Sequence, residues 1–222
     1  MSPFTIAGPS GDVPATLYET AQPRHTLILA HGAGAGQKHP WMRARAGDLA
    51  DRGVRVVTFD FPYITAGRRV PDRPPLLLET WRRVVDRVHA RWPDVPLAIG
   101  GKSMGGRMAT MLVAEADAPA AVCACVALGY PLHPPGKPEQ LRIAHLGAIR
   151  VPLLVVQGER DPFGGPDEIR REFGAAGARV EVVDVPRGGH GFEVRGKDAG
   201  QAEVMAGVAD TVARWLDTLP SL

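Results

Sequence analysis

A serine between glycines, at the junction of a strand-like run and a helix-like run, limits the possible folds of this chain more than any other feature. Residues 101–105 read Gly-Lys-Ser-Met-Gly, after an apolar run at 96–100 and before a helical pattern at 106–114. A serine at the tip of so sharp a turn presses the flanking backbones together, so Gly101 and Gly105 leave no room for a Cβ. The sequence therefore predicts a nucleophile elbow, a strand–turn–helix unit that exposes the hydroxyl of Ser103.

An acid and a histidine follow Ser103 in the order that this unit requires. Asp161 comes just after an apolar strand-like run, and His190 lies in a glycine-rich loop after an alternating run. Glu159 and Asp184 are competing acids. Taken alone, Asp161 could instead cap a turn or a helix, and His190 could cap a turn. Asp161 is preferred because it stands at the end of its strand, so the sequence favours a set of Ser103, Asp161 and His190.

Strand and helix signals alternate along the chain, which is typical of a mostly parallel sheet covered by helices on both faces. A strand or hairpin is expected near 15–19, and strands near 26–30, 54–59, 96–100, 121–128, 152–158 and 179–186. Helices are expected near 40–52, 75–92, 106–114, 166–176 and 204–219. Residues 60–75 and 129–150 are expected as loops, the second with one helical turn. A single domain over residues 1–222 is predicted, with no insertion long enough for a full cap domain.

The charge balance argues against nucleic acid as a partner. The chain has 26 basic and 24 acidic residues, for a net charge of +2, and an acid interrupts its basic cluster at 68–73. Two nucleotide-binding motifs are also incomplete. Pro96 stands where a phosphate-binding loop ending at Ser103 needs its first glycine, and Gln37 stands where a dinucleotide fingerprint needs its last.

Cysteines, histidines and hydropathy suggest no metal, disulfide or membrane span. Cys123 and Cys125 are two residues apart, so in a regular strand they would face the same side and would not bridge each other. The seven histidines show no short metal-ligand pairing. No apolar stretch approaches the roughly 20 residues that span a bilayer, and the N-terminus lacks a leader pattern. A cytoplasmic protein without a membrane partner is the expectation.

The motifs together resemble the α/β-hydrolase superfamily. The resemblance is carried by residues 101–109, by the run 130–138 and by His31-Gly32-Ala33-Gly34, and it extends from about residue 25 onward. It is closest to a group of small, uncapped, dienelactone-hydrolase-like proteins, most of which are predicted hydrolases. The resemblance implies the α/β-hydrolase fold without a full cap domain, and a serine hydrolase that needs no cofactor and no metal.

The chemistry expected of such a site assigns a role to each residue. A serine hydroxyl is a weak nucleophile near neutral pH, so Ser103 needs His190 as its base and later as the acid for the leaving group. Asp161 would hold the imidazole in the correct tautomer. The tetrahedral oxyanion needs two preorganised donors, which we expect from the backbone N–H of Met104 and of Ala33, with Gly34 as the second choice.

Other residues near the motifs are open to two interpretations. His31 is expected to pack beneath the turn that carries Ala33. Tyr130, Phe163 and Phe192 are candidate walls of the substrate pocket, although ordinary packing would explain them equally well. Lys102 could attract an anionic substrate, and a salt bridge to a neighbouring acid is the favoured alternative.

The sequence thus predicts a serine hydrolase that cleaves a carboxylic ester, thioester or lactone of a small-molecule acyl substrate through an acyl-enzyme. An amidase or peptidase is an alternative within acyl transfer. A non-catalytic interaction module that keeps the fold is the alternative from another class. It is motivated by eukaryotic relatives of the group, one of them found in a histone-acetyltransferase-associated assembly. The sequence does not indicate an oligomeric state.

Overall fold

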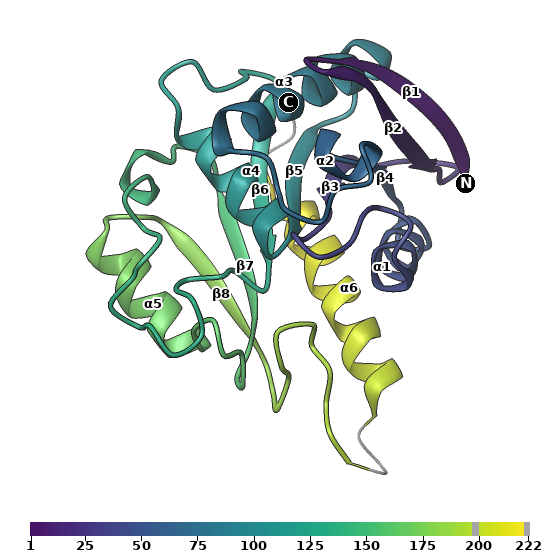
Figure 1. The fold of residues 1–222 in the computed structure, drawn as a ribbon. Coiled ribbons are helices and arrows are strands. Elements are labelled where there is room, and N and C mark those ends of the chain that lie inside the picture. Colours follow the sequence, from purple (N-terminus) through teal and green to yellow (C-terminus); the bar gives the residue numbers. More distant parts are fainter. Residues whose placement is uncertain (197–199, 220–222) are drawn as a thin grey trace.

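Eight strands form one sheet in the order β1-β2-β4-β3-β5-β6-β7-β8, in a computed structural model that describes residues 1–196 and 200–219 (Figure 1). The strands are β1 (Ser2–Gly8), β2 (Gly11–Tyr18), β3 (His25–Ala30), β4 (Val54–Phe59), β5 (Leu97–Lys102), β6 (Val122–Leu128), β7 (Leu153–Gly158) and β8 (Val180–Val185). The six strands from β3 to β8 pair in parallel, and the hairpin of β1 and β2 adds two antiparallel strands at one edge. The predicted α/β class with a mostly parallel sheet is confirmed.

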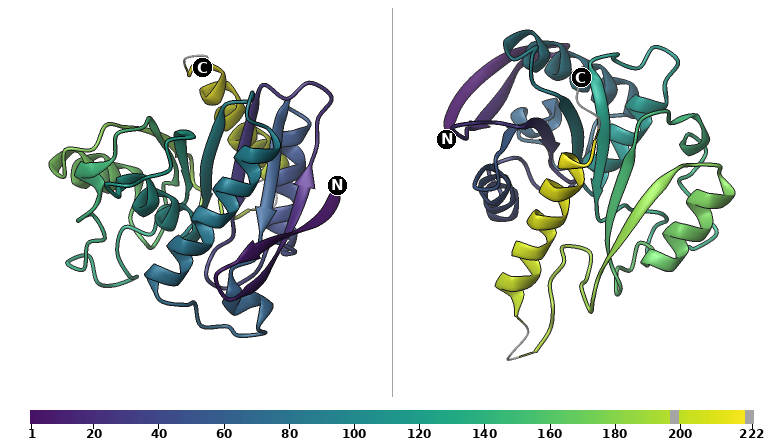
Figure 2. Two further views of the ribbon diagram at one scale, coloured as in Figure 1. Left: turned by 90° about the horizontal axis from the view of Figure 1, so that it is seen from above. Right: turned by 180° about the vertical axis from the view of Figure 1, so that it is seen from behind.

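Helices cover both faces of the sheet. They are α1 (Pro40–Ala50), α2 (Pro62–Thr65), α3 (Pro74–Arg91), α4 (Met104–Ala114), the 3₁₀ turn η1 (Leu146–Ala148), α5 (Pro166–Ala175) and α6 (Gln201–Asp217). Helices α3, α4 and α5 lie on one face of the sheet, and α1 and α6 lie on the other (Figure 2). The core side chains of the first three pack in one cluster, and those of α1 and α6 pack in a second. Within the described ranges, no helix has both the length and the apolar character that a membrane span requires.

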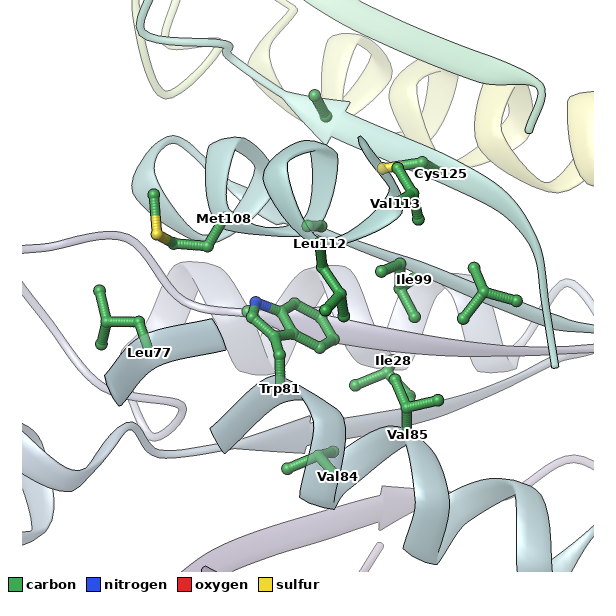
Figure 3. Close-up of a cluster of buried hydrophobic side chains, with 14 of the residues drawn as sticks. Ile28, Leu77, Trp81, Val84, Val85, Ile99, Met108, Leu112, Val113 and Cys125 are labelled. Atoms are coloured by element: carbon green, nitrogen blue, oxygen red, sulfur yellow. The ribbon is translucent and has the colours of Figure 1, made fainter. Parts of the chain in front are cut away.

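Burial on both faces explains the near-continuous apolar runs of the central strands. Every residue of β3, β4 and β7 is buried. Trp81 of α3 is fully buried and lies in the cluster between α3, α4 and the sheet, with Ile28 and Ile99 on the strand side and Leu112 of α4 beside it (Figure 3). This packing fixes α4, and with it the turn at the end of β5.

Three local features differ from the sequence expectation. The N-terminal strand is a longer hairpin than the expected 15–19, and the loop 60–75 contains α2. In β6, the pairing with β5 steps from Val122 to Ala124, so Cys123 is the extra residue of a β-bulge. The two cysteines therefore face opposite sides: Cys125 packs in the cluster with α3 and α4, and Cys123 packs against the cluster with α1 and α6. The expectation that they share a face is wrong, because a bulge reverses the alternation.

Strand β8 forms the edge opposite the hairpin. Its carboxylates Glu181 and Asp184 are exposed, and Arg170 of α5 forms an ion pair with Asp184. This edge therefore carries charged side chains along its length.

Candidate active site

Ser103 occupies the sharp turn between β5 and α4, with φ 51° and ψ −115°. This left-handed backbone is uncommon for a residue with a side chain. A Cβ on Gly101 would lie 2.6 Å from the carbonyl oxygen of Ala30, and one on Gly105 would lie 2.7 Å from that same oxygen. Both glycines are therefore required by contact with backbone, as the motif predicts, although much of that contact comes from β3.

Ser103, His190 and Asp161 form one chain of hydrogen bonds. His190 Nε2 lies 2.9 Å from Ser103 Oγ, and His190 Nδ1 lies 2.7 Å from Asp161 Oδ2. A carboxylate only accepts hydrogen bonds, so Nδ1 carries the ring proton and Nε2 can accept from the serine hydroxyl. The three residues follow β5, β7 and β8, and the carboxyl ends of these parallel strands meet at one edge of the sheet.

Gln157, which sequence reasoning missed, orients the acid. It is fully buried at the end of β7, where its Nε2 donates to Asp161 Oδ2 at 2.9 Å and its Oε1 accepts from Tyr130 N at 2.8 Å. The backbone N–H of Phe163 donates to Asp161 Oδ1 at 2.9 Å. Both carboxylate oxygens are thus satisfied in a buried site. A polar residue at the end of an apolar strand, just before the acid, is the signal that could have revealed Gln157.

Two buried side chains hold the turn that follows β3. The Nδ1 of His31 donates to Gly32 O at 2.8 Å, and its Nε2 accepts from Phe61 N at 3.1 Å. One donor and one acceptor describe a neutral ring, in agreement with the burial that lowers the pKa of His31. Tyr63 Oη donates to Ala33 O at 3.0 Å. His31 packs beneath this turn as expected, and Tyr63 is a second support that the sequence did not reveal.

The expected oxyanion donors lie around Ser103. Met104 is the first residue of α4, and the N–H groups of a first helical turn have no partner within the helix. Ala33 lines the two cavities that Ser103 also lines, and Gly34 lines one of them. The structure thus brings these residues together, and their role as donors stays a prediction.

Side chains from two other segments hold the loop of His190. Lys102 Nζ donates to the carbonyl oxygen of His190, and Trp41 Nε1 donates to that of Gly191 at 3.0 Å. The carboxylate of Glu193 accepts from Gly191 N at 2.8 Å. Among the described residues Lys102 forms no salt bridge, so the favoured expectation for it is wrong. A backbone carbonyl takes the place of the expected acid.

Comparison with known proteins gives the family of this fold. A family model described as an alpha/beta hydrolase domain matches residues 23–217. The chain belongs to the alpha/beta hydrolase family. The resemblance stated from the sequence is therefore confirmed at the level of the family.

Solved structures of low sequence identity share the fold of this alpha/beta hydrolase. An alpha-beta serine hydrolase homologue from Coxiella burnetii superimposes with a TM-score of 0.75 at 18% identity, over 97% of each chain. A serine hydrolase without a lid from Xanthomonas campestris gives 0.72 at 20% identity, over 100% of this chain and 96% of that one. A dienelactone hydrolase from Anabaena variabilis gives 0.74 at 19% identity, over 98% and 97%.

Two cavities meet at Ser103. The first, which we call the Trp41 cavity, has a volume of about 510 Å³. It is bordered by Ser103 and His190 and walled mainly by apolar groups, among them Trp41, Met42 and Phe163. The second, which we call the arginine cavity, has a volume of about 370 Å³ and lies along the start of α4. The alpha/beta hydrolase thus has two cavities that border its serine and share Ala33 and Phe163 in their lining.

Only one of the three aromatic residues expected in the pocket walls is found there. Phe163 lines both cavities, and its ring lies 4.4 Å from the ring of His190, measured between centroids. Tyr130 and Phe192 are fully buried and pack in the two core clusters instead. They therefore show ordinary packing, the alternative that the sequence left open. The sequence could not decide, because an aromatic residue after a strand has the same pattern in a core and in a pocket wall.

In residues 1–196 and 200–219, no group of three or more histidine, cysteine, aspartate or glutamate side chains is arranged to hold a metal ion.

Proposed function

We propose that this alpha/beta hydrolase is a serine hydrolase that cleaves a carboxylic ester, thioester or lactone through an acyl-enzyme on Ser103. The observation that carries the proposal is the hydrogen-bonded chain from Ser103 through His190 to Asp161. A nucleophile, a base and a group that orients the base stand in the geometry that acyl transfer requires. We further propose that residues 1–222 act as one domain and that the substrate is a small acyl compound.

Each group has a task in the proposed reaction. His190 takes the proton of Ser103 as the hydroxyl oxygen attacks the acyl carbon, and it gives that proton to the leaving group. Asp161 stabilises the imidazolium that forms between these steps. The N–H groups of Met104 and Ala33 stabilise the oxyanion. Water then repeats the sequence and releases the acid.

Similar structures support an ester as substrate. One solved structure is Est1E from Butyrivibrio proteoclasticus with ferulic acid bound, which shares the fold at 17% identity and a TM-score of 0.73, over 97% of this chain and 100% of that one. Another is the dienelactone hydrolase described above. The half-open cavities beside Ser103 also favour a small ester over a peptide, because no additional domain positions an extended chain in the described residues.

Replacement of Ser103 by alanine tests the proposal. We expect Ser103→Ala to lower kcat/KM for benzyl and p-nitrophenyl esters by about a thousandfold or more, because the nucleophile is lost and the rest of the site stays intact. Ser10→Ala, in the exposed turn between β1 and β2, is the control and should keep full activity. Equal rates for Ser103→Ala and the wild type would contradict the proposal.

A covalent probe separates the enzyme from an interaction module that keeps the fold. A fluorophosphonate should label the wild type at Ser103 and leave Ser103→Ala unlabelled. Absence of labelling in the wild type would favour the interaction module.

A further inference from the structure

Two arginines line the arginine cavity beside the nucleophile. Arg107 lies one helical turn after Ser103, since its N–H donates to Ser103 O at 3.0 Å, and both residues line this cavity. Arg142 comes from the loop after β6. Its own N–H donates to Leu132 O at 2.9 Å, and its carbonyl accepts from Tyr130 Oη at 2.6 Å. The backbone that carries this second guanidinium is therefore held in place.

Neither Arg107 nor Arg142 forms an ion pair among the described residues. One carboxylate, Asp72, also lines the cavity: its Oδ1 pairs with Arg68 at 2.7 Å, and its Oδ2 is buried without a partner in the described residues, so two guanidinium charges face one carboxylate that is already paired. The Nε of Arg107 is buried and has no partner in this part of the chain. Burial and then the charge of Arg107 lower the pKa of Arg142, and the same two causes lower that of His145 to about 4. Two arginines that repel each other at a cavity wall are well suited to a ligand carboxylate, which a guanidinium binds in a bidentate geometry.

The position of His190 indicates which part of an ester enters each cavity. The leaving group must accept its proton from His190 Nε2, and His190 is a wall of the Trp41 cavity. The arginine cavity is bordered instead by Met104 and Met108, along the start of α4. The leaving group therefore belongs in the apolar Trp41 cavity, and the acyl chain belongs in the arginine cavity.

We propose that the preferred acyl group carries a second carboxylate, which Arg107 and Arg142 bind, so that the substrate is a half-ester or half-thioester of a dicarboxylic acid. This inference rests on the proposed function. The leaving group is then an apolar alcohol or thiol. The methylene chain between the two carboxyl groups would lie against the apolar wall of Leu77, Met104 and Met108.

The hydrolysis of such a half-ester needs no reactant other than water. Ser103 Oγ forms a bond to the ester carbon and its proton passes to His190, after which the bond to the leaving oxygen breaks and that oxygen takes the proton. Water then adds to the acyl carbon and gives a proton to His190, the bond to Oγ breaks, and Oγ takes the proton back. The distal carboxylate stays ionised throughout, and the product is a free dicarboxylic acid.

A matched pair of esters tests the inference. Monobenzyl adipate and benzyl hexanoate have the same leaving group and the same number of acyl carbons, and they differ in the terminal carboxylate. We expect the wild type to prefer the adipate half-ester in kcat/KM by about 10- to 100-fold, the range for hydrogen bonds to a charged group. The preference should fall as sodium chloride is added.

Variants assign the preference to the two arginines. Arg107→Met and Arg142→Met should each remove most of the preference, by lowering kcat/KM for the half-ester much more than kcat/KM for benzyl hexanoate. Arg142→Lys should restore part of it. Arg83→Met, an exposed arginine of α3 that pairs with Glu79, is the control and should behave as the wild type.

Two results would overturn the inference: equal wild-type rates on the two esters, or an equal loss on both esters in the methionine variants. The proposed function has a separate outcome. If Ser103→Ala abolishes hydrolysis of benzyl hexanoate while no preference for the half-ester exists, only the inference fails. If Ser103→Ala hydrolyses both esters as fast as the wild type, the proposed function fails.

Discussion

Lys102 places an ammonium group in largely apolar surroundings next to the nucleophile. Its Nζ lies 5.7 Å from the ring centroid of Trp41 and 5.9 Å from that of Phe192. Burial lowers the pKa of Lys102 to about 8, and the charges of Asp161 and Glu193 oppose this shift in part. In the unfolded chain the pKa returns to its ordinary value of 10.5. Between these two values the unfolded state binds more protons, so the free energy of unfolding rises with pH.

Replacement of Lys102 should remove that rise. We expect the stability of the wild type relative to Lys102→Met to increase by about 1 to 3 kcal/mol between neutral pH and about pH 10.5, since one pKa unit corresponds to about 1.4 kcal/mol. Urea unfolding at a series of pH values measures the difference. Lys38→Met, at an exposed position, is the control. Parallel pH profiles for the wild type and Lys102→Met would contradict the expectation.

The residues of the candidate site that the sequence could predict are those fixed by local motifs. Ser103 is marked by its two glycines, and Asp161 and His190 are marked by their places after successive strands. Gln157 stands only four residues before Asp161, so its place at the end of an apolar strand was a local signal. Tyr63 acts through a contact between segments distant in sequence, and no local pattern encodes such a contact. The same reason explains why the contact of Lys102 was not predicted. Its partner is a backbone carbonyl 88 residues away and not a side chain of opposite charge.

At the scale of secondary-structure elements, the close approach of α4 and β3 makes the turn at Ser103 sensitive to one added methyl group. A Cβ on Gly105 would lie 2.6 Å from His31 O, whereas one on Gly47, inside α1, would meet nothing within 4 Å. We expect Gly105→Ala to destabilise the protein by about 1 to 3 kcal/mol, the range for overpacking a core. Gly47→Ala should stabilise it by about 0.5 to 1 kcal/mol, because alanine favours the helix.

Chemical denaturation of both glycine variants measures the contrast. Gly47→Ala serves as the matched control, because it makes the same substitution in a helix with free space. A similar change in stability for the two variants would show that the contact with β3 does not restrict this turn.

The elements themselves were largely predictable, and their irregularities were not. Periodicity predicts α3 over 75–92, within one residue of the observed Pro74–Arg91. The bulge at Cys123 in β6 has no such signal, because all residues around it are small and apolar and fit either face. The short helix α2 escaped prediction because its four residues are too few to show a helical period.

At the scale of the whole molecule, burial of apolar side chains should dominate stability over surface charge pairs. Arg24 links the start of β3 to the end of α6 through two hydrogen bonds to Asp217, at 2.9 and 3.0 Å, but half of its side chain is exposed. Trp81 is fully buried. We expect Trp81→Ala to lower the free energy of unfolding by about 3 to 5 kcal/mol. Arg24→Met should lower it by less than about 1 kcal/mol.

Guanidinium unfolding of both variants measures these two differences. Trp81→Phe is the control for the size of the side chain. It keeps most of the volume and removes an indole N–H that has no acceptor in the described residues, so it should be milder than the alanine variant. An equal effect of Arg24→Met and Trp81→Ala would contradict this order.

The charged outer edge of β8 has a consequence for how copies of this protein meet. An open strand presents unpaired N–H and C=O groups to any extended chain that approaches it. A second copy that added a strand to the sheet here would bring further charged side chains against Glu181 and against the ion pair of Asp184 with Arg170. We therefore expect these charges to disfavour the pairing of another strand with β8.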